Sequence, residues 1–188
     1  MKTAIVFYSQ HHKNTKKLVD AIKGAGPEVK LIDVSITKVT ELDGYDRIGI
    51  VSGIYYSKFA KPLMEYLATH LPEGKGVFTL YTCGQMRASY TKDVQALVEE
   101  KEGTYLGEYG CLGFYTFGPF KLVGGLQKGH PTEEEIQGAV AESTKQCVKA
   151  YKRFVEDYPD YQVDVKLCAF TSSEMEKAKK EFDIQMEN

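Results

Sequence analysis

Side chains able to bind a ligand follow directly after an apolar run near the start of the chain. The run ends at Tyr8, and the residues after it carry hydroxyl, imidazole, ammonium and amide groups; these are Ser9, Gln10, His11, His12, Lys13, Asn14 and Thr15. A helical pattern then begins, with apolar residues at Leu18, Val19 and Ile22. The start of a helix exposes unpaired N–H donors and the positive end of its dipole. A polar loop between a strand and a helix therefore suits the binding of a phosphate.

Two further segments add aromatic and cationic side chains. Residues 53–61 include Tyr55 and Tyr56, and residues 83–90 include Gly84 and Tyr90. A flat ring can stack on such tyrosines while backbone N–H and C=O groups bind its edge. Together with the phosphate loop, the two segments favour a nucleotide with a flat ring system, although loop tyrosines are also ordinary surface residues with partly buried rings.

The elements that must position these segments alternate between strand and helix. The predicted strands are Thr3–Tyr8, Val29–Val34, Asp46–Ser52, Val77–Thr82 and Tyr105–Tyr115. The predicted helices are Lys16–Lys23, Pro62–Leu71, Thr91–Lys101 and Pro131–Asp157, with Thr91 and Thr132 as N-caps. This alternation predicts a parallel sheet with helices on both faces. Such sheets bind ligands beyond the carboxyl ends of the strands, where the three polar segments belong.

Bulk properties indicate one soluble domain. The chain has 188 residues, of which 43% are hydrophobic and 27% charged, and its net charge is −2. No apolar run approaches the roughly 20 residues of a membrane span, and Lys2 leads straight into a strand rather than a secretory signal. We therefore expect a cytoplasmic protein that binds neither membranes nor nucleic acid, with its four cysteines reduced.

Several other chemistries lack their motifs. The adjacent His11 and His12 have no Glu-x-x-His spacing or nearby carboxylate to support a metal site. Ser9 starts its loop and has no Gly-x-Ser-x-Gly elbow, which argues against a serine hydrolase. Neither a Walker loop nor a dinucleotide fingerprint follows the first strand.

Two stretches resemble the flavodoxin family. Residues 8–15 are similar to its phosphate-binding loop, which joins a hydroxyl residue to an Asn-Thr pair at the start of the first helix. Residues 113–121, Gly124-Gly125 and 128–131 resemble a segment of a branch of small flavodoxin-like proteins. The resemblance covers about residues 1–155. It implies an α/β fold, a doubly wound five-stranded parallel sheet of order 2-1-3-4-5, with FMN at the carboxyl edge.

The resemblance also implies a set of cofactor-binding residues. Those for the FMN phosphate are Ser9, His11, His12, Lys13, Asn14 and Thr15. Those around the isoalloxazine are Gly53, Ile54, Tyr55, Tyr56, Thr82, Cys83, Gly84 and Tyr90. Lys13 stands where similar loops commonly carry glycine. Either it adopts positive φ at an energetic cost, or its ammonium supplies a further countercharge for the phosphate.

Three functions fit this reading. The first is an FMN-binding redox protein that exchanges electrons with partner proteins and needs no catalytic side chain. The second is an FMN-dependent NAD(P)H or quinone oxidoreductase, which needs space beside the ring for a second flat substrate. Residues 55–59 and 114–120 either wall such a space or belong to core and lid packing, and packing is favoured for Phe114 and Phe117 because aromatic residues are more often buried than catalytic. The third is an interaction module that has lost FMN. Lys58, Lys61 and Arg87 beside the ring predict a flavin potential less negative than that of acidic carriers.

The end of the chain extends beyond the family resemblance. We assign residues 1–157 to the flavodoxin-like domain and residues 158–188 to an extension, with a strand at Gln162–Ala169 and a helix at Ser172–Phe182. Val163, Val165 and Leu167 alternate as one face of a strand. That strand could add to the edge of the sheet or contact a second chain, which leaves a homodimer open.

Overall fold

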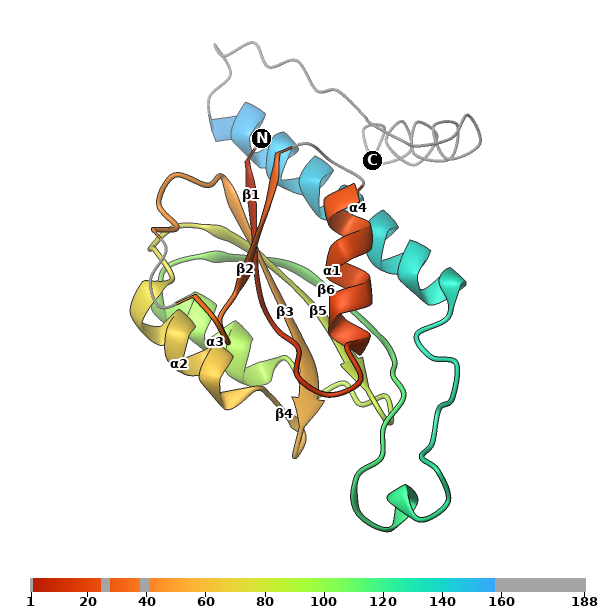
Figure 1. Ribbon diagram of the computed structural model, residues 1–188. Helices are drawn as coiled ribbons and strands as arrows, with labels where there is room; N and C mark the ends of the chain where they lie inside the picture. The colour runs from red at the N-terminus through yellow and green to blue at the C-terminus, as the bar shows by residue number, and fades with distance from the viewer. Residues whose placement is uncertain (1, 25–27, 38–40, 158–188) are drawn as a thin grey trace.

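A parallel sheet forms the centre of the molecule (Figure 1). The computed structural model describes residues 2–24, 28–37 and 41–157, with the backbone alone from residue 146 on. The five long strands are β1 (Thr3–Tyr8), β2 (Val29–Asp33), β3 (Arg47–Tyr55), β5 (Gly76–Cys83) and β6 (Thr104–Leu112). Their order is β2-β1-β3-β5-β6, all parallel, which confirms the predicted doubly wound sheet.

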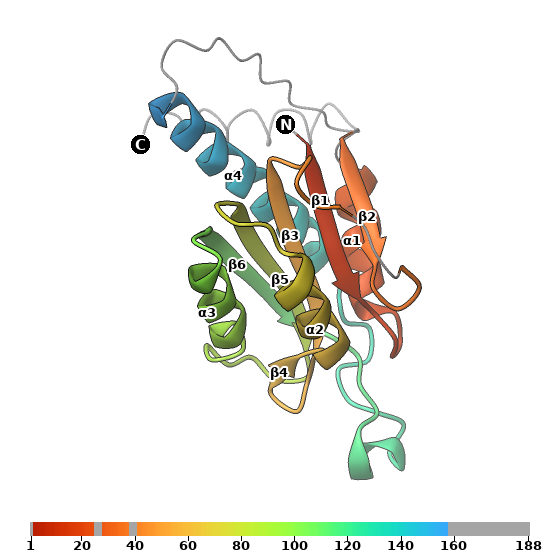
Figure 2. The same ribbon diagram turned by 90° about the vertical axis from the view of Figure 1, so that its left-hand side faces the viewer.

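Helices cover both faces of the sheet, as Figures 1 and 2 show. One face carries α1 (Asn14–Gly24) and α4 (Glu133–Asp157), and the other carries α2 (Lys61–His70) and α3 (Lys92–Glu100). A short 3-10 helix, η1 (Gly118–Lys121), lies in the long loop between β6 and α4. Within the described residues, none of the helices has the length and apolar character needed to cross a membrane.

The two larger hydrophobic clusters lie on opposite faces of the sheet because strand residues alternate between its faces, and a third, smaller cluster joins α1, β6 and α4. Ala4 and Val6 belong to the cluster that includes residues of α2 and α3. Ile5 and Phe7 belong to the cluster that includes residues of α1. Within this second cluster Gly49 is required, since a Cβ there would lie 2.5 Å from Cδ1 of Ile5.

The third predicted strand is longer than expected. Gly53, Ile54 and Tyr55 lie in β3 rather than in a loop, because β3 continues into a hairpin with β4 (Lys58–Phe59). The two turn residues, Tyr56 and Ser57, have φ of 51° and 66°. A two-residue hairpin turn of this kind normally carries Asn-Gly, so Tyr56-Ser57 does not indicate a turn from its residue types.

The ends of other elements also differ from the predictions. Helix α1 starts at Asn14, two residues before the predicted Lys16. Strand β6 ends at Leu112, short of the predicted Tyr115, because the chain leaves the sheet to start the long loop. Thr132 caps α4 as predicted: the Glu135 N–H donates to its hydroxyl at 3.2 Å and the Thr132 N–H donates to the Glu135 carboxylate at 2.7 Å.

Thr91 is the N-cap residue of α3, as predicted, but it does not cap the helix with its side chain. The Thr91 side chain makes no capping hydrogen bond. Its hydroxyl donates instead to the Glu108 carboxylate on β6, because the neighbouring strand offers a charged acceptor, and charged acceptors form stronger hydrogen bonds. The strand and helix predicted for 162–169 and 172–182 lie outside the described residues, so the division at residue 157 stays a prediction.

Candidate functional site

The loop between β1 and α1 is a tight turn with left-handed backbone. His12 and Lys13 both have φ of 54°, which costs about 1–2 kcal/mol for a residue other than glycine. The Lys17 N–H donates to the Lys13 carbonyl at 3.2 Å, and the Lys16 N–H donates to Oγ of Ser9 at 3.2 Å. Ser9 therefore satisfies one of the free donors at the start of α1. Of the two roles left open for Lys13, the structure shows the strained backbone.

Asn14 and Thr15 lie in the first turn of α1 and connect it to neighbouring segments. Nδ2 of Asn14 donates to the Phe114 carbonyl at 2.7 Å, which holds the start of the long loop (residues 113–132). The Thr15 hydroxyl lies 3.1 Å from the Thr82 hydroxyl at the end of β5, and both residues are buried. The β1–α1 loop is thus fixed to β5 and to the long loop.

A cavity of about 230 Å³ lies between the phosphate loop, α1 and the long loop. Its lining residues are His12, Asn14, Lys17, Phe114, Lys128, Gly129 and His130. The His12 ring packs on Phe114 at a centroid distance of 4.5 Å, and its Nε2 lies 3.0 Å from Oγ1 of Thr116. The cavity therefore joins ammonium groups, imidazoles and an amide beside the N-terminus of a helix, a set of groups that suits an anion.

The carboxylate of Glu135 contacts His130, which lines the cavity, and its oxygens are already hydrogen-bonded. Glu135 accepts the Thr132 N–H at 2.7 Å and the Leu112 N–H at 3.2 Å, and its Oε2 lies 2.8 Å from Nδ1 of His130. Burial alone would raise the pKa of Glu135, but these N–H groups and the His130 ring together hold it below its ordinary value. The negative charge of Glu135 is therefore compensated by these hydrogen-bond donors.

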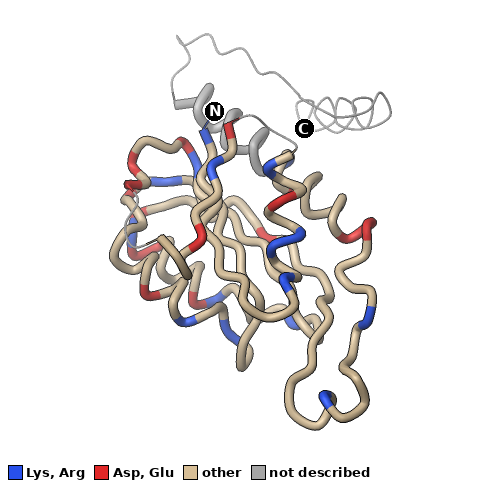
Figure 3. Tube along the Cα trace, viewed as in Figure 1, with Lys and Arg blue, Asp and Glu red and all other residues tan. Residues whose placement is uncertain are grey.

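The segments at the carboxyl edge of the sheet carry cations and no carboxylates. In residues 8–17, 53–62, 83–92 and 113–132, the Lys and Arg residues are Lys13, Lys16, Lys17, Lys58, Lys61, Arg87, Lys92, Lys121 and Lys128, with no Asp or Glu. Figure 3 shows this on the long loop, where every coloured segment before α4 is blue. These four segments therefore carry net positive charge although the chain as a whole has a net charge of −2, and three of their lysines, Lys16, Lys58 and Lys61, pair with carboxylates of the adjoining helices.

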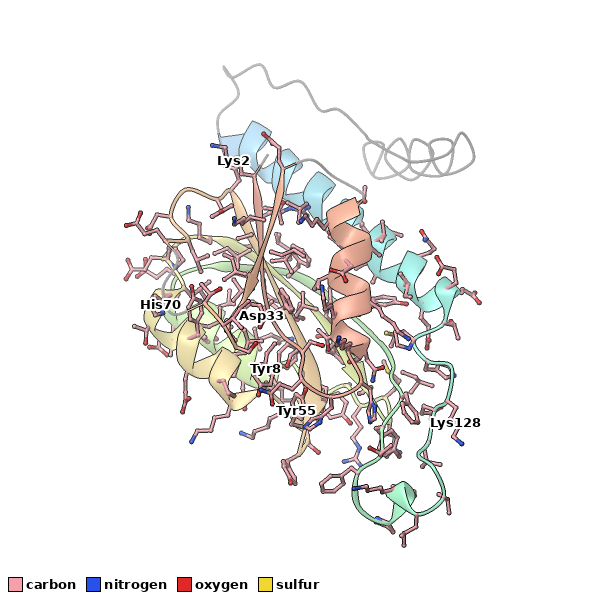
Figure 4. All side chains as sticks on the ribbon, in the orientation of Figure 1. Lys2, Tyr8, Asp33, Tyr55, His70 and Lys128 are labelled. Carbon is pink, nitrogen blue, oxygen red and sulfur yellow. The ribbon has the colours of Figure 1, made fainter. Side chains whose placement is uncertain are left out.

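Tyr55 closes the phosphate loop from the side of β3. Its ring lies 6.1 Å from that of Tyr8 and 6.0 Å from that of His11, between centroids, and Figure 4 shows Tyr8 and Tyr55 together at the lower end of the sheet. Burial raises the pKa of Tyr55, while hydrogen bonds from the backbone N–H groups of Gln10 and His11 act in the opposite direction.

Tyr56 of the β3–β4 hairpin and Phe117 of the long loop contact each other on the solvent-exposed side of the site, which we call the open side. The Tyr56 side chain is 86% exposed and Phe117 is 64% exposed, yet their rings form an edge contact at 5.4 Å between centroids. This contact joins the β3–β4 hairpin to the long loop. The two rings are thus placed where a flat group at this edge would contact them.

The third segment contributes backbone rather than side chains. A Cβ on Gly84 would lie 2.5 Å from the Tyr115 ring, so glycine is needed for the long loop to approach. Tyr90 is 6% exposed, packs on Tyr81 and donates its hydroxyl to the Gln85 carbonyl at 2.8 Å. Cys83 is buried, and burial raises its pKa to about 11. Tyr90 and Cys83 thus face the core beneath the segment.

The predicted site residues therefore divide into two groups. Those in the β1–α1 loop, or at the cavity and the aromatic opening beside it, are Ser9, His11, His12, Lys13, Asn14, Tyr55, Tyr56 and Gly84. Those buried beneath it are Thr15, Gly53, Thr82, Cys83 and Tyr90, while Ile54 is half-buried and packs against the hydrophobic cluster of α2 and α3. The sequence prediction missed Lys17, Lys128 and His130, which line the cavity. The sequence contained a partial signal for Lys128, because residues 113–132 contain lysines but no carboxylates, which is typical of a segment that contacts an anion.

Comparison with known proteins gives a consistent result. A family model described as a flavodoxin domain matches residues 5–105. An uncharacterized protein of Methanocaldococcus jannaschii is 36% identical over 143 residues, which cover 74% of this chain and 93% of that protein.

Two solved structures share the fold. A flavodoxin from the domain Archaea has a TM-score of 0.59 at 19% identity, covering 79% of this chain and 99% of that one. An NADPH-quinone reductase from P. pentosaceus has a TM-score of 0.55 at 13% identity, covering 76% and 97%. At these identities the likeness concerns the fold alone.

Proposed function

Because the chain belongs to the flavodoxin domain family, we propose that it binds FMN at the carboxyl edge of its sheet and exchanges electrons with partner proteins. The observation that carries the proposal is the cation-lined cavity at the start of α1, placed beside an aromatic opening. FMN has a phosphate at one end and a flat ring at the other, and the two parts of the site match these two ends.

The cavity fits the phosphate end. Lys17 and Lys128 supply ammonium donors, His12 supplies an imidazole, and α1 begins beside them with its positive dipole end. In the described residues neither Lys17 nor Lys128 has a carboxylate partner within ion-pair distance. An incoming phosphate would therefore meet donors that no internal carboxylate neutralises.

The cavity is too small to hold the isoalloxazine ring of FMN together with its phosphate. Its volume of about 230 Å³ is below the roughly 300–1,000 Å³ of sites that enclose a drug-sized ligand. The isoalloxazine would therefore lie on the open side, between the β3–β4 hairpin and the long loop. Tyr56 and Phe117 are exposed there and offer ring faces, and Gly84 supplies backbone close to Tyr115.

Bound FMN supplies the redox chemistry itself, since the flavin ring accepts and releases electrons. The chain's own residues bind and orient it. The aromatic side chains of the opening limit access of water to one side of the ring, and the cations of the edge favour negative charge nearby. None of the side chains is proposed to transfer a proton.

An absorbance spectrum tests the proposal. The purified chain is incubated with FMN, passed through a desalting column and examined for the visible absorbance of flavin. We expect the colour to remain with the protein fraction. A colourless protein after incubation with excess FMN would favour the third reading, an interaction module without cofactor.

A second candidate is an FMN-dependent NAD(P)H or quinone oxidoreductase. It is supported by the fold shared with an NADPH-quinone reductase and by the open side of the site, where a second flat molecule could reach the ring between Tyr56 and Phe117. Anaerobic addition of NADPH or NADH to the FMN-loaded chain separates the two candidates. Rapid bleaching without a partner reductase would favour the enzyme, and a stable spectrum would favour the electron carrier.

A further inference from the structure

The long loop presents apolar side chains to solvent. Leu122 is 90% exposed, Val123 69% and Phe120 38%, and Phe117 joins Tyr56 beside them. Scattered single apolar residues on a surface need no explanation, whereas a group of them marks an interaction site. Figure 1 shows the loop extending below the sheet, away from both helical layers.

Hydrogen bonds give this loop a defined shape. Residues Gly118–Lys121 form η1, and the Gly125 N–H donates to the Phe120 carbonyl at 2.7 Å. Tyr115 and Leu126 exchange a pair of backbone hydrogen bonds of 3.1 and 2.9 Å across the base of the loop. The exposed positions of Leu122 and Val123 are thus set by the fold of the loop itself.

The loop is also fixed to the candidate site. His12 contacts Thr116, Asn14 holds Phe114, and Tyr56 contacts Phe117. A molecule bound to the loop would therefore lie next to the opening where the flavin ring is proposed to be. For an electron carrier, this is where a partner must approach.

The charged side chains of the long loop itself are all positive. Lys121 lies between Phe120 and Leu122 in the chain, and Lys128 follows on the same loop. Some cations of the edge have carboxylate partners on adjacent helices, as Lys58 has in Asp93 at 2.8 Å. In the described residues Lys121 and Arg87 have none within ion-pair distance. Hence a partner with negative charge is favoured.

We infer that Tyr56, Phe117, Phe120, Leu122 and Val123 form a docking surface for an acidic redox protein. An apolar and aromatic centre surrounded by charge is the usual composition of a protein interface. The identity of the partner as a redox protein rests on the proposed function. The surface itself follows from exposure and charge alone.

Other occupants fit less well. A second copy of the chain, related by two-fold symmetry, would bring the same positive surfaces face to face. Insertion into a membrane would carry the Lys121 ammonium into the hydrocarbon region together with its apolar neighbours, which is costly. These occupants are therefore outcomes that the test must be able to detect.

The test is a calorimetric titration of the full chain, with and without FMN, against an acidic plant-type [2Fe–2S] ferredoxin as probe. We expect binding at low ionic strength that weakens by about tenfold when salt rises to about 0.15 M, because salt screens the charges. A basic c-type cytochrome is the opposite-charge control and is expected not to bind. Vesicles with about one quarter anionic lipid test the membrane alternative, and we expect no binding there.

Variants separate the surface from general charge. Leu122→Ser with Val123→Ser should weaken ferredoxin binding by about tenfold, because exposed apolar anchors carry much of the energy of an interface. Lys121→Glu should also weaken ferredoxin binding, and the loss of affinity should be larger at low salt than at high salt. Ile36→Ser is the matched apolar control, since Ile36 is 81% exposed outside this surface. Lys23→Glu, at the other end of α1, is the matched charge control.

The results are decisive in both directions. The inference would be overturned if ferredoxin did not bind, or if the cytochrome bound equally well. It would also be overturned if vesicles bound instead, if the chain self-associated through this surface, or if test and control variants had equal effects. FMN binding is measured separately on the same samples by quenching of flavin fluorescence. Loss of flavin binding with docking retained would contradict the proposed function and leave the docking surface standing.

Discussion

Left-handed backbone at residues other than glycine is rare within the sheet and frequent at its carboxyl edge. Among the described residues, His12, Lys13, Tyr56, Ser57 and Gln127 have it in the loops of that edge, whereas Glu102 has it at the end of α3. Backbone strain of this kind persists only where the surrounding structure imposes it, and it gathers at functional sites.

The two regions also differ in what holds them together. The strands are held by apolar residues that alternate between two clusters, as Ala4 and Ile5 do. The edge is held by polar contacts between segments far apart in the chain, such as Asn14 with Phe114. The apolar interior therefore contributes most of the stability, and it compensates for the strained backbone that positions donors and rings at the edge.

The largest expected effect concerns the interior. Gly49→Ala would bring a Cβ within 2.5 Å of Ile5 and 2.6 Å of Phe78. We expect a loss of about 3 kcal/mol in the free energy of unfolding, at the upper end for overpacking, measured by urea denaturation. Gly44→Ala is the control, because its Cβ would meet nothing within 4 Å. Equal stability of the two variants would contradict the packing described for the interior.

The next effect concerns the edge alone. Lys17→Gln and Lys128→Gln should each weaken FMN binding by about tenfold, as expected for loss of one charged hydrogen bond to a phosphate. The free energy of unfolding should stay nearly unchanged, because both side chains line the cavity rather than the core. Lys23→Gln controls for net charge. FMN affinity that is equal in all three variants would remove Lys17 and Lys128 from the site.

A smaller effect concerns backbone strain. Lys13→Gly should raise the free energy of unfolding by up to about 1 kcal/mol, because glycine adopts positive φ without the steric cost of lysine. Glu102→Gly is the matched variant, with φ of 52° away from the edge. Urea denaturation of both variants tests this. A destabilised Lys13→Gly beside a stabilised Glu102→Gly would show that the lysine side chain contributes contacts that outweigh its strain.

The smallest effect is a dependence on pH. The pKa of Glu135 is lowered by folding, so its contribution to stability is present above its ordinary pKa of 4.5 and is lost as the pH falls through its lower value in the folded state. The stability advantage of the wild type over Glu135→Gln should be less than about 1 kcal/mol near neutral pH. It should shrink on acidification to pH ~3. A difference that stays constant over this range would show that the charge of Glu135 contributes nothing.

Much of the fold could be predicted from the sequence because local patterns determine it. The run Thr3–Tyr8 and the periodic Leu18, Val19 and Ile22 each identify their element without reference to distant residues. The hairpin turn at Tyr56 and Ser57 could not be predicted, since its residues are those that such a turn normally avoids.

The candidate site was predicted less completely. Residues 9–14 follow a strand and precede a helix, so their place at the edge could be inferred from local order. Lys128 and His130 lie more than a hundred residues farther along the chain and reach the same cavity only through the path of the long loop. At Thr91 the local pattern predicted the position of the helix start but not the side-chain hydrogen bond. Its hydroxyl donates to Glu108 on the neighbouring strand, which is 17 residues away in the sequence.

The central claim is that the start of α1 and the long loop together hold the phosphate of FMN. Parallel calorimetric titrations of the chain with FMN and with riboflavin, which lacks the phosphate, test it most directly. We expect tight binding of FMN and binding of riboflavin weaker by at least about hundredfold, since several charged hydrogen bonds are lost. Equal affinity for the two flavins, or no heat with either, would contradict it.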